Sequence, residues 1–439
     1  MNIKIIGSTN INHIATKEEF DTAGGHFAGI CYMKNDFDSI LSEPQEKTER
    51  RVNLTKTGGH HSVYDHEFVN LYLEDIPKGL AMVLNNENMY TTSEKSARYT
   101  KMVLSENEQK LYDKWSNIYE QQIREVYAAK YPKYFTDLKI KKLAQENARY
   151  LTSVLTPTSM AYTVSYRQLN QLYAMIKREI SDPTLKDTRC NLSKILEPSM
   201  KEFCTYLENN IPYIDAELSK NPKDRKLSIN GSPDMDENFG SVYSTSYEAT
   251  YAYFAQVQRH RTIDYSIFDL SEPKFYIPPI IKNNKELTAE WEADCKSLES
   301  IVPQGTIIGI NERGTIENFI LKLKERKCSA TQLETDKTTT LQLYHYITEL
   351  KNKKYFNQSK LDGSIAVIKY YQLMDNSIHK KDISLTTDYE KEKAAKIVET
   401  TQKQIDLLEP FTKGSRCTAG YKCPTPCGFP DGINGTRII

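Results

Sequence analysis

The sequence predicts an α+β protein built from two domains. Its 439 residues are more than one hydrophobic core of ordinary size organises, so two cores are expected. A short strand-like opening at residues 1–7 and a stretch near residue 110 with apolar residues at helical spacing indicate mixed secondary structure. Turn residues with little apolar content gather between about residues 215 and 240, where we place the boundary between the halves.

A helix is predicted after Ser105 in the first half. Ser105 and Glu108 have the spacing of a capping box. The apolar residues that follow recur at helical period, and we interpret them as core and not as cofactor contacts; they are Leu111, Trp115, Ile118, Tyr119 and Ile123.

A second helix is predicted over Tyr247 to Gln258. This stretch contains no Gly or Pro and is rich in Ala and Tyr. The helix would deliver the tripeptide Arg259 to Arg261 at its C-terminal end.

Charge and hydropathy narrow the class of protein. Lys plus Arg and Asp plus Glu each total 58, so there is no net positive field for a nucleic acid polymer. No apolar run approaches the roughly 20 residues of a membrane-spanning helix, and the N-terminus does not read as a signal peptide. Five of the 8 cysteines are scattered singly, which is typical of reduced thiols. We therefore expect a cytoplasmic protein with no membrane partner.

Two short segments carry residues suited to a nucleotide. They are residues 93–99, Ser-Glu-Lys-Ser-Ala-Arg-Tyr, and residues 256–261, Gln-Val-Gln-Arg-His-Arg. Arg presents a planar fork of donors that stays charged, which suits the dianion of a nucleoside monophosphate. Arg98, Arg149 and Arg259 are therefore candidates for phosphate or uracil contacts. The competing interpretation is that Arg98 and Arg149 make surface ion pairs with neighbouring Glu residues.

Two further side chains suit the same ligand. Ser96 and the amides beside it supply donors, and Gln256 carries the donor and acceptor that a uracil edge requires.

The two segments resemble parts of one motif of the flavin-dependent thymidylate synthases. In that family a His after an acidic residue leads through a helix to Arg-His-Arg and then to Glu-x-Ser-x-Arg-Tyr. Here residues 60–66 resemble its start and Glu94 to Tyr99 its end, but Asn86 to Asn88 replace Arg-His-Arg. In the second half Arg259 to Arg261 restore Arg-His-Arg, yet no Ser-x-Arg-Tyr follows. Each half keeps what the other lost.

A second resemblance lies downstream, where the family has a Leu-Pro-type strand, Asn-x-Arg and a helix with Ala-Gln-x-Glu. The first half has Leu155 to Pro157, with Ser165 to Gln168 where Asn-x-Arg is expected. The second half has Asn311 to Arg313, and Ala330 to Glu334 echo the helix signature with one insertion. The counterpart of Arg149 is absent there.

The resemblance implies two tandem copies of one domain, each an antiparallel sheet with surrounding helices. We place the first domain at 1–215, a linker at 216–239, the second domain at 240–410 and a Cys-rich tail at 411–439.

The implied activity is FAD-dependent reductive methylation of dUMP to dTMP, with methylene-tetrahydrofolate and NADPH as co-substrates. No Cys here has the context of a nucleophile, which fits the flavin route. The implied catalytic residues are Arg98 and Arg259. The implied substrate-binding residues are Glu94, Ser96, Arg98, Arg149, Gln256 and Arg259. The implied FAD-binding residues are His66, Arg259, His260, Arg261, Asn311 and Arg313. His66 alone is equally well explained as a core or capping residue.

Family members are homotetramers whose sites draw on several subunits. A duplicated chain is therefore expected to form fewer, composite sites, with a homodimer reproducing the tetramer. Two alternatives remain open. One is a related flavin enzyme that modifies another pyrimidine nucleotide, and the other is a non-catalytic protein that binds flavin or a nucleotide.

The tail contains Cys417, Cys423 and Cys427 among Pro and Gly residues. Three thiolates in a tight loop suit zinc or an iron–sulfur cluster, with Cys328 or Cys295 as a fourth ligand. No Cys-x2-Cys occurs, so a tail that simply packs is the competing interpretation.

Overall fold

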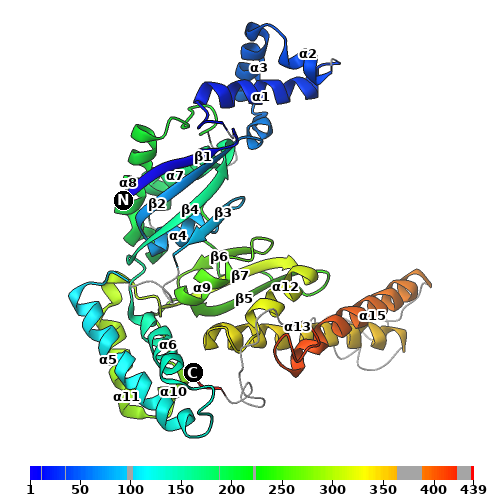
Figure 1. The fold of residues 1–439 in the computed structure, drawn as a ribbon. Helices are drawn as coiled ribbons and strands as arrows, with labels where there is room; N and C mark the ends of the chain where they lie inside the picture. The colour runs from blue at the N-terminus through cyan, green and yellow to red at the C-terminus, as the bar shows by residue number, and fades with distance from the viewer. Residues whose placement is uncertain are drawn as a thin grey trace.

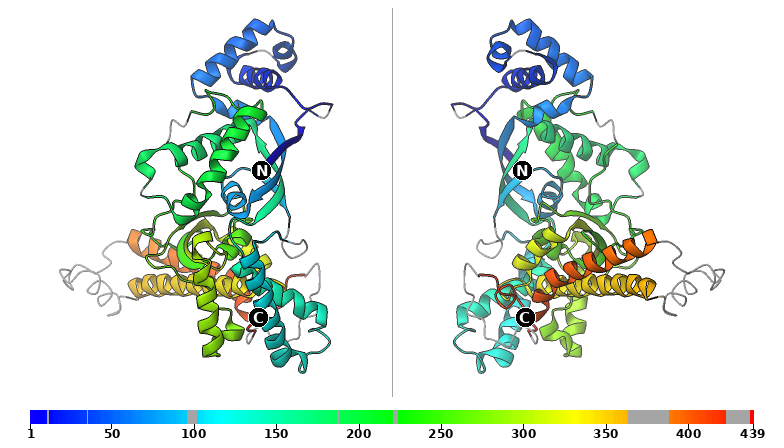
Figure 2. Two further views of the ribbon diagram at one scale, coloured as in Figure 1. Left: turned by 90° about the vertical axis from the view of Figure 1, so that its left-hand side faces the viewer. Right: turned by 90° about the vertical axis from the view of Figure 1, so that its right-hand side faces the viewer.

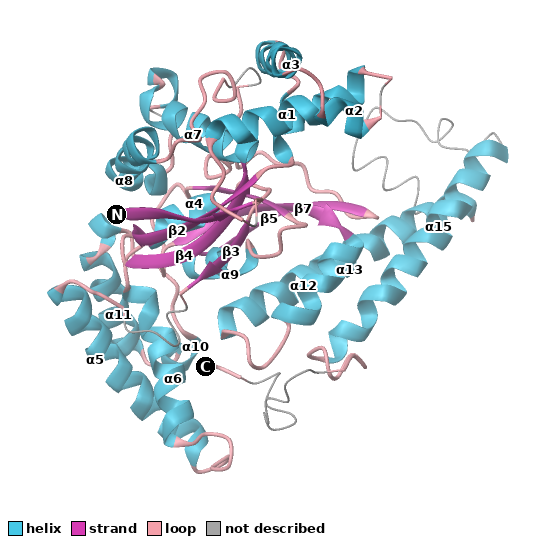
Figure 3. Ribbon diagram, turned by 45° about the horizontal axis from the view of Figure 1, so that its top comes forward, coloured by secondary structure: helices cyan, strands magenta, loops and turns pink. Residues whose placement is uncertain are grey.

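Two antiparallel β-sheets form the centre of the molecule, with helices around them (Figures 1 and 3). The computed structural model describes residues 1–10, 12–34, 36–95, 102–186, 188–220, 224–362, 388–422 and 437–439. The α+β class and the antiparallel sheets are confirmed.

The first sheet has the strand order β1-β2-β4-β3. Its strands are β1 (Asn2–Ser8), β2 (Phe68–Pro77), β3 (Thr91–Glu94) and β4 (Pro157–Ser165). The predicted strand at the N-terminus is therefore confirmed. The helices of this half are α1 (Lys17–Tyr32), α2 (Phe37–Leu41), α3 (Gln45–Thr57), α4 (Lys78–Leu84), α5 (Glu106–Ile123), α6 (Asp137–Ala148), α7 (Tyr166–Ser181) and α8 (Asn191–Asn210). Short helical turns are η1 (His61–Asp65), η2 (Arg124–Ala128), η3 (Arg149–Leu151) and η4 (Pro183–Leu185).

The second sheet has the strand order β5-β7-β6. Its strands are β5 (Val242–Thr250), β6 (Asp264–Phe268) and β7 (Ile307–Thr315). The helices of this half are α9 (Tyr251–Val257), α10 (Pro279–Lys282), α11 (Lys285–Ser297), α12 (Ile316–Arg326), α13 (Leu333–Leu361) and α15 (Asp388–Leu408), with the turns η5 (Glu299–Ile301) and η7 (Glu409–Lys413).

One predicted helix begins later than expected. Residues 247–250 belong to β5, and α9 starts at Tyr251. Thr250 stops the strand because its hydroxyl accepts a hydrogen bond from the backbone N–H of Tyr253 and caps the helix. The expectation of helix over Tyr247 to Gln258 is therefore wrong at its start, where pairing with β7 overrides local propensity.

Three strands of the first sheet, β2-β4-β3, have the same order as β5-β7-β6, and their registers agree except in β2 before its bulge between Leu73 and Ile76. In the first sheet Pro77 pairs with Pro157, and Glu94 pairs with Met160. In the second sheet Thr250 pairs with Ile307, and Ile267 pairs with Ile310. The chain from Pro77 to Glu94 has the same length as the chain from Thr250 to Ile267, whereas the connection that follows, to β4 or β7, is longer in the first half. Positions can therefore be matched residue by residue from β2 to β3 and from β5 to β6.

The sheets meet through backbone pairing and one core. The N–H of Val154 donates to Val302 O at 3.0 Å, and the N–H of Gln304 donates to Thr152 O at 2.8 Å. Apolar residues of both sheets and of α4 and α9 belong to a single buried cluster. The segment 216–239 contributes to it, because Leu218, Leu227 and Ile229 are buried there.

Helices from the two halves also form a separate bundle. Trp115 of α5 meets Trp291 of α11 edge-on, with ring centroids 4.8 Å apart. Figures 1 and 2 show α5 and α6 beside α10 and α11, at the opposite end of the molecule from α1–α3. The predicted cap at Ser105 and the apolar stripe of α5 are confirmed as parts of this packing. Among the described residues, no helix has both the length and the apolar character needed to cross a membrane.

Candidate functional site

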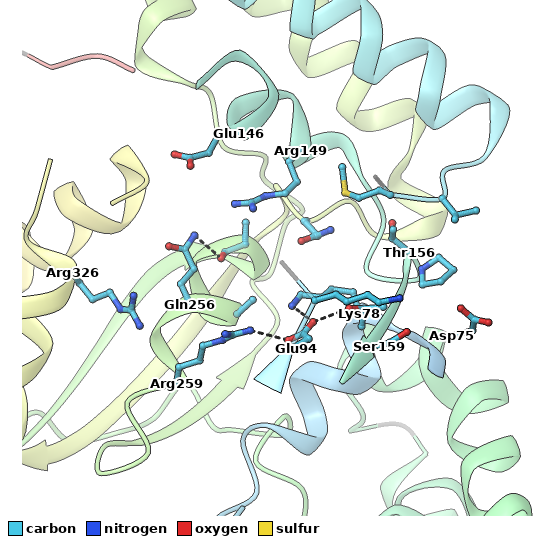
Figure 4. Close-up of a pocket in the computed structure, with 18 residues that line it drawn as sticks. Asp75, Lys78, Glu94, Glu146, Arg149, Thr156, Ser159, Gln256, Arg259 and Arg326 are labelled. Carbon is cyan, nitrogen blue, oxygen red and sulfur yellow. Dashed lines mark hydrogen bonds and ion pairs between the residues drawn. The ribbon is translucent and has the colours of Figure 1, made fainter. Parts of the chain in front are cut away.

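A cavity of about 260 Å³ lies where the two halves meet (Figure 4). The first half contributes the start of α4, the end of β3, η3 and the start of β4. The second half contributes α9, the residue Arg259 that follows it, and the end of α12. The residues that line it are Asp75, Lys78, Glu94, Lys95, Met102, Val103, Glu146, Arg149, Thr156, Pro157, Thr158, Ser159, Ala252, Ala255, Gln256, Arg259, Gln304 and Arg326. We call it the cationic cavity.

Glu94 lies between two cations on the wall of this cavity. Its Oε1 accepts from Lys78 Nζ at 2.6 Å, and its Oε2 accepts from Arg259 Nη2 at 3.0 Å. The Glu94 side chain is 1% exposed, whereas that of Arg259 is 43% exposed. Arg259 therefore keeps donors free to face a ligand while Glu94 holds its orientation.

Lys78 is held in the field of other cations. Burial lowers the pKa of Lys78, the pairing with Glu94 opposes this, and the positive charges of Arg259 and Arg149 lower it further. An anionic ligand in the cavity would offset these positive charges and so raise the pKa of Lys78.

Arg149 and Gln256 approach each other through a shared acceptor. Gln332, which precedes α13, accepts from Arg149 Nη2 at 2.7 Å and from Gln256 Nε2 at 2.5 Å through its Oε1 atom. Thr335 also donates to Gln256 Oε1 at 3.3 Å. The structure thus brings a first-half Arg and a second-half Gln to one wall, as the composite-site hypothesis expects.

A buried carboxylate close to Gln332 in the sequence, that of Glu334, accepts hydrogen bonds from both halves. Glu334 accepts from the N–H and hydroxyl of Thr250 and from the hydroxyl of Tyr150, all within 2.9 Å. Burial raises the pKa of Glu334.

Arg326 is a further cation in the lining of the cavity, and it is hydrogen-bonded to His260. Its Nε donates to His260 Nε2 at 2.8 Å. Burial lowers the pKa of His260 to about 3, and the charges of Arg326 and Lys322 add to this. The ring is therefore neutral at pH 7 and can accept the hydrogen bond. Figure 4 shows Arg326, Gln256 and Arg259 on one side of the cavity, with Lys78 and Glu94 across from them.

The charges of the cavity suit a phosphate dianion. Among its described lining residues five side chains are cationic and three are carboxylates, so the formal charge is +2. A phosphomonoester carries nearly two negative charges near neutral pH.

The structure does not gather all the predicted residues in one place. Glu94, Arg149, Gln256 and Arg259 line the cationic cavity. Ser96 and Arg98 lie outside the described residues, so their roles stay predictions.

His260 and Arg261 lie near the cavity without lining it. Arg261 turns toward the first half, where its Nη1 donates to Tyr90 O at 2.8 Å.

Asn311 and Arg313 lie elsewhere, on β7. Asn311 is buried and donates to Ser232 O at 2.7 Å, and Arg313 is exposed beside Met235. The expectation that they match Ser165 to Arg167 is wrong. Ser165 ends β4 and caps α7, and the residue in the same place of the second half is Thr315, which ends β7 and caps α12.

His66 does not line the cationic cavity. Its ring is exposed and stacks on Phe27, with centroids 4.1 Å apart. Nearby, Asp65 accepts from Ser165 Oγ at 2.6 Å and pairs with Arg167 at 2.7 Å, on the wall of another small cavity. Of the six residues predicted to hold FAD, only Arg259 lines the cationic cavity. One chain therefore does not gather them into one FAD site.

The tail gives no support for a metal. Cys423 and Cys427 lie outside the described residues, and within the described part no group of His, Cys, Asp or Glu has metal-binding geometry. Cys417 is exposed, and hydrogen bonding by Ser415 lowers its pKa. Cys295 is buried and its pKa is raised by burial, which disfavours the thiolate that a metal needs.

Sequence reasoning missed Lys78 and Arg326. Lys78 follows a Pro at the end of a strand, and Arg326 ends an amphipathic helix. Neither belongs to a motif. Lys78 comes near Arg259, through Glu94, only because the two halves pack together, and Arg326 comes near it because α12 packs beside His260 of the same half.

Comparison with known proteins supports the family resemblance for the first half. Residues 14–183 match the family model described as "Thymidylate synthase complementing protein". No curated protein sequence matches the chain.

Solved structures with a partial likeness include two kinds of enzyme. Thymidylate synthase X from Helicobacter pylori with FAD and dUMP is 15% identical, covers 50% of this chain and 100% of its own, and has a TM-score of 0.29. A UMP/dUMP methylase, PolB from Streptomyces cacaoi, is 14% identical, covers 47% of this chain and 90% of its own, and has a TM-score of 0.28. The resemblance to the flavin-dependent thymidylate synthase family is thus confirmed by the family match over residues 14–183.

Proposed function

We propose that the chain binds a pyrimidine nucleoside monophosphate in the cationic cavity and methylates C5 of its base, converting dUMP to dTMP. The observation that carries this proposal is the convergence of Glu94, Arg149, Gln256 and Arg259 on one cavity, although they come from two distant parts of the sequence. Their chemistry matches the three parts of the ligand: a phosphate, a sugar and a base edge with both donors and acceptors.

The side chains would divide the work by charge and shape. Arg149, Arg259 and Arg326 present guanidinium groups to the phosphate and to the carbonyl oxygens of the base, where they would stabilise the electron-rich form of the ring whose C5 is nucleophilic. Gln256, held by Gln332 and Thr335, offers its amide to the uracil edge. Lys78 neutralises Glu94, so that this carboxylate does not repel the phosphate.

Arg98 is the further catalytic residue of this proposal. Its support is the match of residues 94–99 to the family motif that continues directly from Glu94.

We also propose that the chain is a tandem duplication of one domain. The order shared by β2-β4-β3 and β5-β7-β6, the matching register of these strands after the β2 bulge and the equal chain length from β2 to β3 and from β5 to β6 support this. The proposed divisions stay at 1–215, 216–239, 240–410 and 411–439.

FAD would be held by Arg259 and His260 beside the cavity together with residues of a second copy of the chain. The dispersal of His66, Asn311 and Arg313 within one chain supports the need for that copy, in a homodimer equivalent to a tetramer of single domains. Reducing equivalents come from FAD and NADPH, and the one-carbon unit comes from methylene-tetrahydrofolate. A cytoplasmic location remains a prediction of the sequence.

Spectroscopy of the purified protein tests this proposal. We expect flavin absorption that bleaches with NADPH and returns when dUMP and methylene-tetrahydrofolate are added. Turnover with UMP or a cytidine nucleotide, and none with dUMP, would keep the flavin chemistry and replace the substrate. A protein that binds flavin and nucleotide without turnover would be a non-catalytic homologue. Failure to bind FAD would remove the assignment.

A further inference from the structure

A second cavity is lined by residues that occupy, in the other half, the same positions as residues lining the cationic cavity. It has a volume of about 650 Å³. Residues 306–308 line it at the start of β7, and residues 156–158 line the cationic cavity at the start of β4. Tyr251 lines it at the first position of α9, as Lys78 does at the first position of α4. The two cavities are therefore equivalent parts of the two halves.

The net charge of the residues that line the second cavity is opposite in sign to that of the first. Glu299 begins η5 at the position where Arg149 begins η3. Among its described lining residues two are cationic and three are acidic, which gives a formal charge of −1; they are Lys194, Lys296, Asp269, Glu272 and Glu299. A phosphate dianion that is attracted by the cationic cavity would be repelled here.

The residue equivalent to Arg259 carries no positive charge. Counting from the start of α4 and α9, Asn86 takes the place of Arg259. Its amide does not line the second cavity but donates to Ser228 Oγ at 2.5 Å and to Tyr265 O at 2.9 Å. This position has become part of the packing between the halves.

The acidic motif is replaced in the same way. In the second sheet Ile267 has the pairing position that Glu94 has in the first sheet. Two residues after Ile267, Asp269 therefore corresponds in the sequence to Ser96. Asp269 is engaged by the N–H of Asn191 at 2.7 Å, at the start of α8.

From these paired differences we infer that three matched positions decide which cavity takes the nucleotide: Lys78 against Tyr251, Arg149 against Glu299, and Arg259 against Asn86. The chain therefore binds one nucleoside monophosphate, although its backbone repeats the site twice. This inference rests on the proposed function, because it assumes that the cationic cavity is the nucleotide site.

Calorimetric titration of the full-length, FAD-loaded protein with dUMP tests the inference. We expect one dUMP per chain. Arg149→Glu, which gives the cationic cavity the residue of its counterpart, should weaken binding at least 100-fold. Glu299→Gln, at an exposed position of the second cavity, should leave both the stoichiometry and the affinity unchanged. Thermal unfolding of both variants checks that each is folded.

The position of the ligand supplies the independent readout. In crystals grown with 5-bromo-dUMP, the anomalous signal of bromine should mark one site per chain, beside Arg259. Two dUMP per chain, or bromine beside Glu299, would overturn the inference while leaving the proposed function standing. Absence of any nucleotide binding by the wild-type protein would overturn both.

Discussion

Residues 86–88 and 259–261 occupy the same place in the two halves and do different work. Glu87 is buried and accepts from the N–H and the hydroxyl of Ser228, both at 2.7 Å, so the first tripeptide packs against the segment between the halves. Arg259 of the second tripeptide reaches into the cationic cavity, and His260 supports Arg326 beside it. The comparison teaches that one backbone position can serve packing in one half and present a charged side chain to a cavity in the other.

The largest expected effect concerns a buried charge pair that only the second half has. Lys322 pairs with Glu312 at 2.6 Å with both side chains fully buried, where the first half has Tyr162 and Leu172. Lys322→Met should lower the free energy of unfolding by about 3–5 kcal/mol, because it leaves Glu312 buried and unpaired.

The double variant Lys322→Leu with Glu312→Tyr, which copies the first half, should recover most of that loss. Urea unfolding of the three proteins measures both effects. A single variant as stable as the wild type would show that the pair contributes nothing.

The next effect is a dependence of stability on pH through His260. Its folded pKa of about 3 lies below the ordinary value near 6.5, so only the unfolded chain binds a proton as the pH falls through 6.5. Between pH 7 and pH 5 this lowers the free energy of unfolding by about 2 kcal/mol. His260→Gln should lose this component in urea unfolding at the two pH values. An equal pH dependence in the variant would refute the assignment to His260.

A smaller effect is expected at Lys78, whose counterpart in the second half is Tyr251. Lys78→Met should leave the Glu94 carboxylate to Arg259 alone and weaken dUMP binding about tenfold, or about 1.4 kcal/mol. Lys78→Arg keeps the charge and is the matched control. Equal affinities of the Met and Arg variants would show that the charge at this position is irrelevant.

The smallest effect is expected at Asn86, the counterpart of Arg259. Asn86→Ala removes the hydrogen bonds to Ser228 and to Tyr265 O and should cost about 1 kcal/mol of stability. The affinity for dUMP should not change, because Asn86 does not line the cationic cavity. Thermal unfolding and dUMP titration of the same sample measure both quantities. A loss of affinity without a loss of stability would reverse the interpretation.

Much of the fold followed from local patterns. The capping box at Ser105, the apolar stripe of α5 and the strand at the N-terminus form as predicted, because each depends on a few neighbouring residues. The start of α9 did not, because Tyr247 is held in a strand by pairing with β7, far along the chain.

The site shows the same division. Glu94 and Arg259 were found from short motifs, and their spacing alone could not show that they pair. Asn311 was placed by a tripeptide match that strand register contradicts. Arg326 carries no local signal, since its place on the wall of the cationic cavity depends on how α12 packs near His260.

The central claim is that residues of both halves bind one nucleotide, and parallel dUMP titrations of Arg149→Gln and Arg259→Gln in the FAD-loaded protein test it most directly. Each loses charge-assisted hydrogen bonds, so each should bind dUMP about 10- to 100-fold more weakly than the wild type. If only one of the two variants binds more weakly, a single half makes the site and the account is contradicted.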